Sequence, residues 1–248
     1  MVQRFSQGQQ LNVGVVGATG LVGSMMRELL AERNFPVGTL RLFASARSAG
    51  KQVDFNGTAV MHDEAGLKRL VASTYQAVSG AGLAGIEILA RQLAQVGDRA
   101  AELARNGQAD FLPAAEKWAA PIAHNIAPLN YVLGEDDYTE EELKLRDESR
   151  KILNIPGLPV SGTCVRVPVF TGHGISVNAE FERPISAARA LELLEAAPGV
   201  VVTAAPDSLA ATGLDPVLVG RIRPDRSVEH GIALFVVGDN LRKGAALN

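Results

Sequence analysis

The sequence has little that would mark a secreted, metal-binding or nucleic-acid-binding protein. One cysteine, Cys164, among 248 residues excludes an intramolecular disulfide and a CxxC metal site, and it fits a reducing compartment. The 24 Lys and Arg are balanced by 27 Asp and Glu, so nothing points to nucleic acid as a partner. No window reaches the ~20 apolar residues of a membrane helix, and the first ten residues lack the apolar stretch of a signal peptide. We therefore expect a cytoplasmic protein.

The composition predicts a folded α/β chain of one large domain or two small ones. Hydrophobic residues make up 47% of the chain, enough to bury a core against the loss of conformational entropy. Apolar residues over 11–16 precede a glycine turn, and apolar residues recur at helical spacing over 21–30. A second strand is expected over 38–45 and an extended piece over 53–60. This opening is a βαβ unit of a parallel sheet.

The remainder reads as mixed α and β segments. A short helix over 63–70 should lead into a strand over 70–78, and a long amphipathic helix should follow from Ile86 until Asn106-Gly107 ends it. Thr139 and Glu142 form a capping box that opens a charged helix running to about Asn154. Strands are then expected over 160–170 and 174–182, a helix over 186–197, and strands near Val200 and over 232–237.

A glycine-rich turn follows the first expected strand. It reads GATGLVG, with Gly17, Gly20 and Gly23 where a dinucleotide pyrophosphate would rest on the helix N-terminus. Glycine there permits the tight turn and the close approach of backbone N–H groups. The turn could also be no more than a helix start, but its place between strand and helix favours cofactor binding.

The loop after the second strand predicts which cofactor is bound. An acidic residue there would accept hydrogen bonds from a ribose 2′-hydroxyl, but the chain offers Ser45, Arg47 and Ser48, with Lys51 nearby. Hydroxyls and a guanidinium suit a phosphate dianion, so NADP is favoured over NAD. The alternative is a solvated basic loop.

A second glycine cluster matches GxGxxG more literally than the first. It spans Gly80 to Gly85 between an expected strand and an expected helix. The helix leads into a polar, proline-containing stretch instead of a further strand, so the βαβ context of a dinucleotide fingerprint is missing. We expect this cluster to be a loop lining a substrate pocket.

Polar residues at the end of an apolar strand are candidates for chemistry. Arg166 lies on a strand that is otherwise apolar and needs a partner, for which a substrate carboxylate is suitable. His173 follows a glycine, where a general acid or base could sit, although a lone histidine is more often structural. Glu148 and Lys151 are three apart on an expected helix and by themselves indicate only a solvated ion pair.

Six segments in order resemble the aspartate-β-semialdehyde dehydrogenase family nearly end to end: GATGLVG, SARS, TYQAVSGAGLAG, ESRKIL, SGTCVRVPVFTGH and GDNLRKGAALN. The resemblance implies NADP-dependent reduction of L-aspartyl 4-phosphate to the semialdehyde, in lysine, threonine and methionine biosynthesis. The reaction passes through a thioester on a cysteine. The related N-acetyl-glutamyl-phosphate reductases fit RVPVFTGH and STYQAVSG less well.

The resemblance assigns roles to individual residues. His173 would be the acid and base, with Gln76 beside the reacting centre. Arg166 would bind the substrate carboxylate, Glu148 its amino group and Lys151 the phosphate. Residues implied to bind NADP are Gly17, Thr19, Gly20, Leu21, Val22, Gly23, Ser45, Arg47, Ser48, Ser79, Gly80 and Asn240.

The chain departs from the family pattern at the nucleophile. The family carries it in an Asn-x-Cys-Thr turn, whereas here the third extended piece, VDFNGTAV, runs directly into Met61. This chain also lacks three other parts of the family pattern. They are the later strands of the nucleotide domain, a phosphate-binding SSxxR segment and the final helix. Cys164 is expected in a strand, where the family has a cysteine that is not the nucleophile, so we expect no acyl-enzyme to form.

These observations predict a truncated Rossmann-like nucleotide-binding domain joined to an α+β substrate and dimerisation domain. Residues 1–60 and 231–248 would form the first, because the last strand should return to its sheet, and residues 61–230 the second. A homodimer is expected by resemblance. Two functions remain open: an inactive semialdehyde dehydrogenase by descent, or a non-catalytic relative that acts as partner or regulator of an intact subunit.

Overall fold

The computed structural model describes residues 11–16, 21–33, 35–43, 61, 64–128 and 132–246. The extended piece expected over 53–60 falls outside these ranges. The same is true of six residues assigned to the cofactor: Gly17, Thr19, Gly20, Ser45, Arg47 and Ser48.

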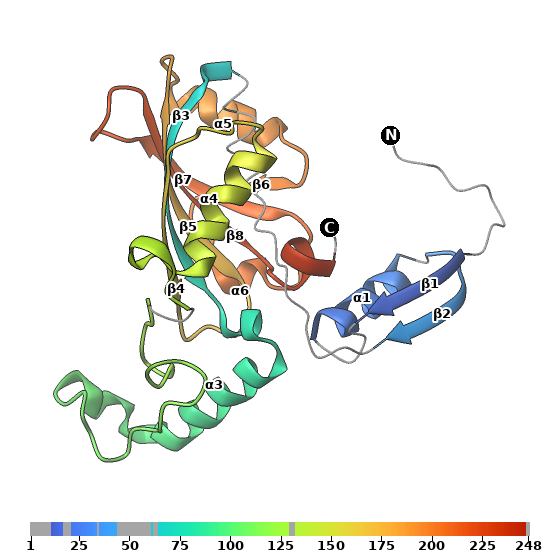
Figure 1. The fold of residues 1–248 in the computed structure, drawn as a ribbon, viewed down its shortest axis with the longest axis vertical. Helices are drawn as coiled ribbons and strands as arrows, with labels where there is room; N and C mark the ends of the chain where they lie inside the picture. The colour runs from blue at the N-terminus through green and yellow to red at the C-terminus, as the bar shows by residue number, and fades with distance from the viewer. Residues whose placement is uncertain are drawn as a thin grey trace.

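The expected opening of strand, helix and strand is confirmed. Strand β1 (Leu11–Val16) pairs in parallel with β2 (Val37–Phe43), and helix α1 (Leu21–Glu32) connects them. Leu21, Val22 and Gly23 form the first turn of α1. This βαβ unit stands beside the larger part of the molecule in Figure 1.

A mixed six-stranded sheet forms the larger part, in the order β4-β3-β5-β8-β7-β6. Pairs β3–β4 and β6–β7 are parallel and the other pairs are antiparallel. The strands are β3 (Leu67–Gln76), β4 (Val160–Arg166), β5 (His173–Phe181), β6 (Val200–Val202), β7 (Val217–Pro224) and β8 (Gly231–Gly238).

The expected place of the last strand is wrong. Strand β8 lies between β5 and β7 and pairs with both of them, not with β1 or β2. Ile232 and Leu234 from β8 enter the core of the six-stranded sheet, and this apolar contact explains the placement. The domain boundaries themselves stay a prediction.

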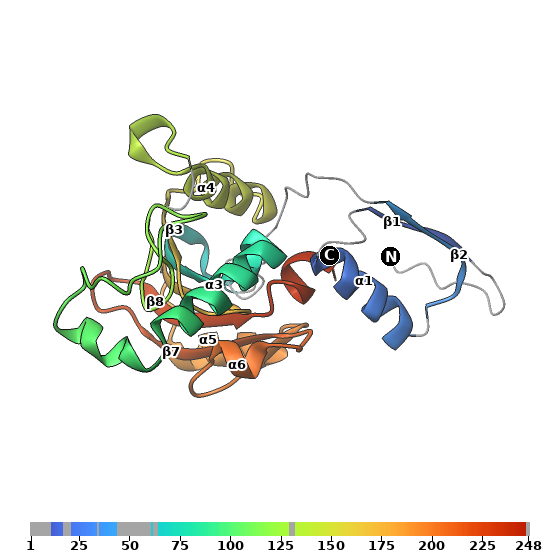
Figure 2. The same cartoon turned by 90° about the horizontal axis from the view of Figure 1, so that it is seen from below.

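Helices α4 (Glu140–Ile152) and α5 (Ala187–Ala196) pack on one face of this sheet. The capping box at Thr139 is present, because its hydroxyl accepts from Glu142 N and the Glu142 carboxylate accepts from Thr139 N. Leu145 of α4 and Leu194 of α5 join Phe181 in one buried cluster. The short helix α6 (Ser208–Ala211) contributes Ala211 to a smaller cluster with β7 and β8. Figure 2 shows the helices from below.

Helix α3 (Leu83–Val96) extends away from the sheet (Figure 1) and carries its own small core. A 3-10 turn (Val78–Ala81) precedes it and another (Gly97–Ala104) continues it. The following chain folds back over α3, where Trp118 and Ile122 pack against Leu89. Two further short elements are a 3-10 turn (Glu135–Asp137) and a π-helical turn (Arg242–Ala246).

Two sequence-based expectations fail in this part. Residues 67–70 belong to β3 and not to a helix, because an irregularity in the β3–β5 register between Leu67 and Arg69 puts Leu67 and Leu70 on one face at a helix-like spacing. Strand β7 was not expected, since Gly220 and Pro224 interrupt its apolar pattern. No helix among the described residues is long and apolar enough to span a membrane.

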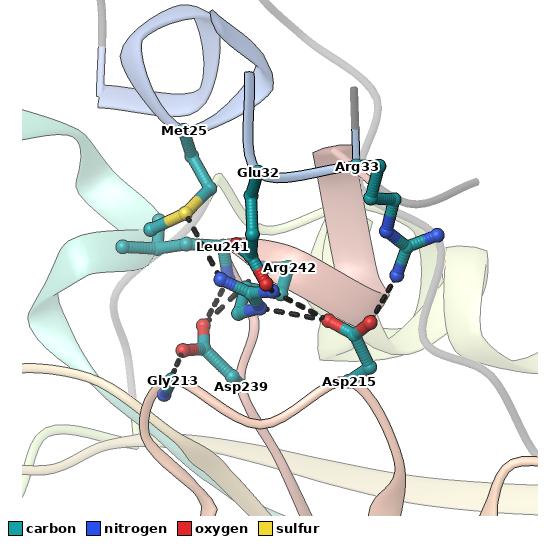
Figure 3. A network of polar contacts seen from close by, with 8 residues as sticks. All are labelled: Met25, Glu32, Arg33, Gly213, Asp215, Asp239, Leu241 and Arg242. Carbon is teal, nitrogen blue, oxygen red and sulfur yellow. Dashed lines mark hydrogen bonds and ion pairs between the residues drawn. The ribbon is translucent and has the colours of Figure 1, made fainter. Parts of the chain in front are cut away.

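Helix α1 meets the segment after β8 through a polar cluster centred on Arg242 (Figure 3). The Arg242 guanidinium lies 2.7 Å from Asp215 and 3.3 Å from Glu32 of α1. Arg33 forms a second ion pair with Asp215. Asp239 accepts hydrogen bonds from the backbone N–H groups of Leu241, Arg242 and Gly213. Among the described side chains, these ion pairs join α1 and Arg33 to the six-stranded part.

Candidate active site

Four predicted site residues meet at one edge of the six-stranded sheet. Gln76 and Arg166 end the parallel strands β3 and β4 and are register partners. His173 begins the antiparallel strand β5 and pairs with Gly238, and Asn240 follows two residues later. Because parallel strands end at the same edge and antiparallel neighbours begin there, the topology brings together residues up to 164 positions apart.

The backbone of Ala77 links two of these side chains. Its carbonyl accepts a hydrogen bond from Arg166 Nη1 at 2.6 Å, and its N–H donates to His173 Nδ1 at 3.1 Å. Gly80 packs closely against both, since a Cβ there would lie 2.6 Å from Arg166 Nη1 and 3.3 Å from His173 Nε2. The second glycine cluster thus borders the candidate site.

Ser79 and Asn240 contact each other, although they are 161 positions apart. Ser79 Oγ lies 2.9 Å from Asn240 Nδ2 and 3.1 Å from Oδ1, and Oδ1 also accepts from Gly172 N at 3.0 Å. All of these groups are buried. The contact fixes the turn after β3 against the turn after β8.

Gln76 presents a carboxamide oxygen at this edge. Its side chain is buried, and its Nε2 donates to Glu141 Oε1 at 3.3 Å. Among the described residues, its Oε1 has no hydrogen-bond partner. A buried acceptor in this state is costly unless a ligand or water donates to it.

Glu148 and Lys151 lie away from this edge. Helix α4 runs antiparallel to β4: Glu142 Oε1 accepts from Cys164 N at 2.9 Å, and Arg150 Nε donates to Leu158 O at 2.8 Å. With a rise of about 1.5 Å per residue, Lys151 is about 15 Å further along the helix axis than Glu141.

The helix residue beside Gln76 is therefore Glu141, which was not among the predicted site residues. Lys144 follows Glu141 by one turn and lies 3.9 Å from Glu148. Burial raises the pKa of Glu148, while the charge of Lys144 opposes that shift. The signal that could have found Glu141 is the capping box, since it fixes the start of the helix at the edge where β4 ends.

Cys164 lies inside the sheet and has the surroundings of a structural thiol. Its side chain is 1% exposed in the core formed by β3, β4 and α4. Burial raises its pKa from 9.0 to about 12, despite the opposing effects of Thr74 and Arg166. A reactive cysteine needs a lowered pKa and access, so the expectation that Cys164 is no nucleophile agrees with its surroundings.

The described residues contain no group of three His, Cys, Asp or Glu that could hold a metal ion. What the edge offers is a guanidinium, an imidazole and carboxamides beside a glycine turn. Such donors suit a carboxylate or a carbonyl oxygen.

Comparison with known families gives the class. Residues 59–243 match the family model "Semialdehyde dehydrogenase, dimerisation domain", and residues 12–93 match "Semialdehyde dehydrogenase, NAD binding domain". With the βαβ opening and the polar sheet edge, these matches define an oxidoreductase of the semialdehyde dehydrogenase class that uses a nicotinamide cofactor.

Individual relatives give the family. The chain is 43% identical to aspartate-semialdehyde dehydrogenase of Streptomyces akiyoshiensis and 42% identical to that of Mycolicibacterium smegmatis, each comparison covering 96% of both chains. The solved structure of aspartate semialdehyde dehydrogenase II from Vibrio cholerae, complexed with ASA, has a TM-score of 0.82 at 32% identity and 96% coverage of both. The chain belongs to the aspartate-semialdehyde dehydrogenase family.

The same comparison bears on the expected gap. The alignment with the Streptomyces enzyme spans 324 positions, and this chain has 248 residues, so at least 76 positions have no counterpart here. Because 96% of both chains is covered, most of these positions are internal. An internal segment of the relative is thus missing from this chain.

Proposed function

We propose that this chain is a semialdehyde dehydrogenase by descent that binds NADP and an aspartate-semialdehyde-like ligand without forming the acyl-enzyme. The observation that carries the proposal is the state of Cys164, the sole cysteine of the chain. It is buried, its pKa is raised to about 12, and it lies within a strand. Thioester chemistry needs an accessible thiolate, which this residue does not supply.

The residues at the strand ends of the candidate site would contact the ligand. Arg166 would pair with the ligand carboxylate, and the Gln76 carboxamide and His173 would face the carbonyl. For the ligand amino group we propose Glu141 in place of Glu148, and for an anionic group Lys144 in place of Lys151. The support is the 3.3 Å contact between Gln76 and Glu141 and the distance along α4 to the other pair.

A matched pair of variants tests this choice. Glu141→Gln should weaken binding of aspartate semialdehyde about tenfold, as expected for loss of one charge-assisted contact. Glu148→Gln should leave the affinity within about twofold, because Glu148 lies about 10 Å along the axis from Glu141. Isothermal titration with both variants distinguishes the assignments, and a larger loss in Glu148→Gln would restore the original one.

The cofactor would lie across Ser79, Gly80 and Asn240 with its phosphates toward the start of α1. The support is the absence of a side chain at Gly80, where a Cβ would collide with Arg166, and the buried contact of Ser79 with Asn240. When bound, the nicotinamide supplies hydride exchange. The preference for NADP rests on Ser45, Arg47 and Ser48, and titration with NADP and NAD should show tighter binding of NADP.

Turnover is the decisive assay. Purified chain, NADP, phosphate and aspartate semialdehyde should give no phosphate-dependent NADPH. Measurable turnover that disappears in Cys164→Ser would contradict the proposal. NADP binding without turnover would support it.

The chain would form a homodimer through the sheet face opposite α4 and α5. On that face Tyr75 remains 43% exposed, and its ring centroid lies 5.8 Å from that of Phe235 at a tilted angle of 43°, so the two form an apolar patch for a partner. The alternative function, binding to an intact subunit as its regulator, would use the same face. Light scattering of the chain alone, and co-purification with a tagged intact relative, separate the two assemblies.

A further inference from the structure

The Ala77 peptide holds the imidazole of His173 in one orientation. Ala77 is the N-cap of the 3-10 turn that follows β3 and is fully buried. Its N–H reaches His173 Nδ1 at 3.1 Å from a position 96 residues earlier in the chain. A ring rotated by half a turn would place a carbon at that point and lose the hydrogen bond, so the Nδ1 orientation is favoured.

A backbone N–H can only donate, and this fixes the proton on the ring. In neutral histidine one nitrogen carries hydrogen and the other accepts. Since Nδ1 accepts from Ala77, the hydrogen of the neutral ring belongs on Nε2. We propose that Ala77 is a positioning residue that holds His173 in the Nε2–H tautomer and so makes it a hydrogen-bond donor at Nε2, the ring nitrogen that lies beside Gly80.

A second contact of Ala77 aligns another donor with the first. Its carbonyl accepts from Arg166 Nη1 at 2.6 Å, and both Nη1 and His173 Nε2 lie within 3.3 Å of the point where a Gly80 Cβ would be. The two nitrogens thus border the same glycine. A ligand that contacted both would be an oxygen acceptor, such as a carboxylate or the carbonyl oxygen of a semialdehyde.

The tautomer stands on geometry alone, whereas the ligand's identity rests on the proposed function. If His173 carries its hydrogen on Nε2 at rest, it meets a bound carbonyl as a hydrogen-bond donor. In this form Nε2 has no lone pair in the ring plane with which to accept a proton. Ala77 therefore biases the resting ring toward hydrogen-bond donation at Nε2.

Nitrogen NMR of the ligand-free full chain tests the inference. The chain has four histidines, and ring-labelled His173 is assigned by the signal that disappears in His173→Gln. The spectrum is recorded at about pH 8.5, well above an ordinary histidine pKa of about 6.5. Two-bond correlations between ring nitrogens and ring carbon-bound hydrogens should then show the pattern of the Nε2–H tautomer for His173. A dominant Nδ1–H pattern would overturn the inference.

An ester at position 77 tests whether the Ala77 N–H is the cause of the tautomer preference of His173. Ala77→lactic acid keeps the methyl group and replaces only the N–H, so the Nε2–H fraction should fall toward that of the exposed His124 in the same spectrum. Ala84→lactic acid is the control, because Ala84 lies in the first turn of α3, where N–H groups have no helical partner. An unchanged His173 ring in the Ala77 variant would refute its role. If that variant does not fold, the unsubstituted chain's spectrum still decides the tautomer, and neither result depends on cofactor binding or turnover.

Discussion

The six-stranded sheet and the βαβ unit are held by different kinds of interaction. The sheet buries a continuous apolar cluster between its strands and α4 and α5, with Phe181 and Leu194 almost fully covered. Among the described side chains, the contacts of the βαβ unit with the rest include the ion pairs Arg242–Glu32 and Arg33–Asp215 (Figure 3). Apolar burial contributes more per contact than partly exposed ion pairs.

This difference indicates where the molecule should open first. Regions with few apolar contacts and solvent-exposed ion pairs open at a lower free energy than a packed core. The candidate site edge belongs to the packed region, since β3, β4, β5 and β8 all end or begin there. The ligand-binding edge should therefore persist when the βαβ unit detaches.

The largest expected effect is in the sheet core. Phe181→Ala should lower the free energy of unfolding by about 3–5 kcal/mol, the usual cost of removing a buried aromatic ring, because Phe181 is 1% exposed. Urea denaturation followed by circular dichroism measures it. Leu209→Ala is the control, with a change within about 0.5 kcal/mol, because Leu209 is 87% exposed. Equal losses would mean that the sheet core does not dominate stability.

Cys164 gives a chemical test of the same core. Its pKa of about 12 against an ordinary 9.0 lowers the thiolate fraction at pH 8 by about a thousandfold, and burial blocks access further. Labelling by a disulfide reagent should be slower than in 6 M urea by about a thousandfold or more. Because the folded pKa is raised, its contribution to stability is complete below about pH 9 and is lost as the pH rises toward 12. Rapid labelling of the native chain would contradict this.

The sequence predicts the site edge better than the contacts within it. Arg166 and His173 were candidates from their places on and after an apolar strand, and Gln76 came from the resemblance. Glu148 was also assigned by resemblance, from the segment ESRKIL. Which turn of α4 reaches Gln76 depends on tertiary packing, and Glu141 was missed for that reason. The strand β7 and the place of β8 also depend on long-range pairing, which periodicity does not contain.

Removing the charge of Arg242, which pairs with Glu32 of the βαβ unit, should destabilise the protein less than Phe181→Ala. Arg242→Met keeps most of the side-chain volume and removes its charge, and its partners Asp215 and Glu32 are 38% and 58% exposed. We expect a cost of about 1–2 kcal/mol, below the 3–5 of a fully buried pair. Hydrogen exchange should speed up in α1 and stay unchanged in β3. Faster exchange in β3 would mean that the two regions unfold together.

Lowering the pH should have the smallest effect on stability. Burial of Asp215 works against its ionisation, but Arg242 and Arg33 outweigh it and hold its pKa below the usual 3.8. A carboxylate with a lowered folded pKa stabilises fully above its unfolded pKa, and that stabilisation is lost as the pH falls through the folded value. The protection of α1 relative to β3 should thus decline below about pH 4. Asp215→Asn should abolish this decline, since the amide does not titrate. A decline that persists in Asp215→Asn would assign it to another carboxylate, of which Glu32 is the first candidate to examine.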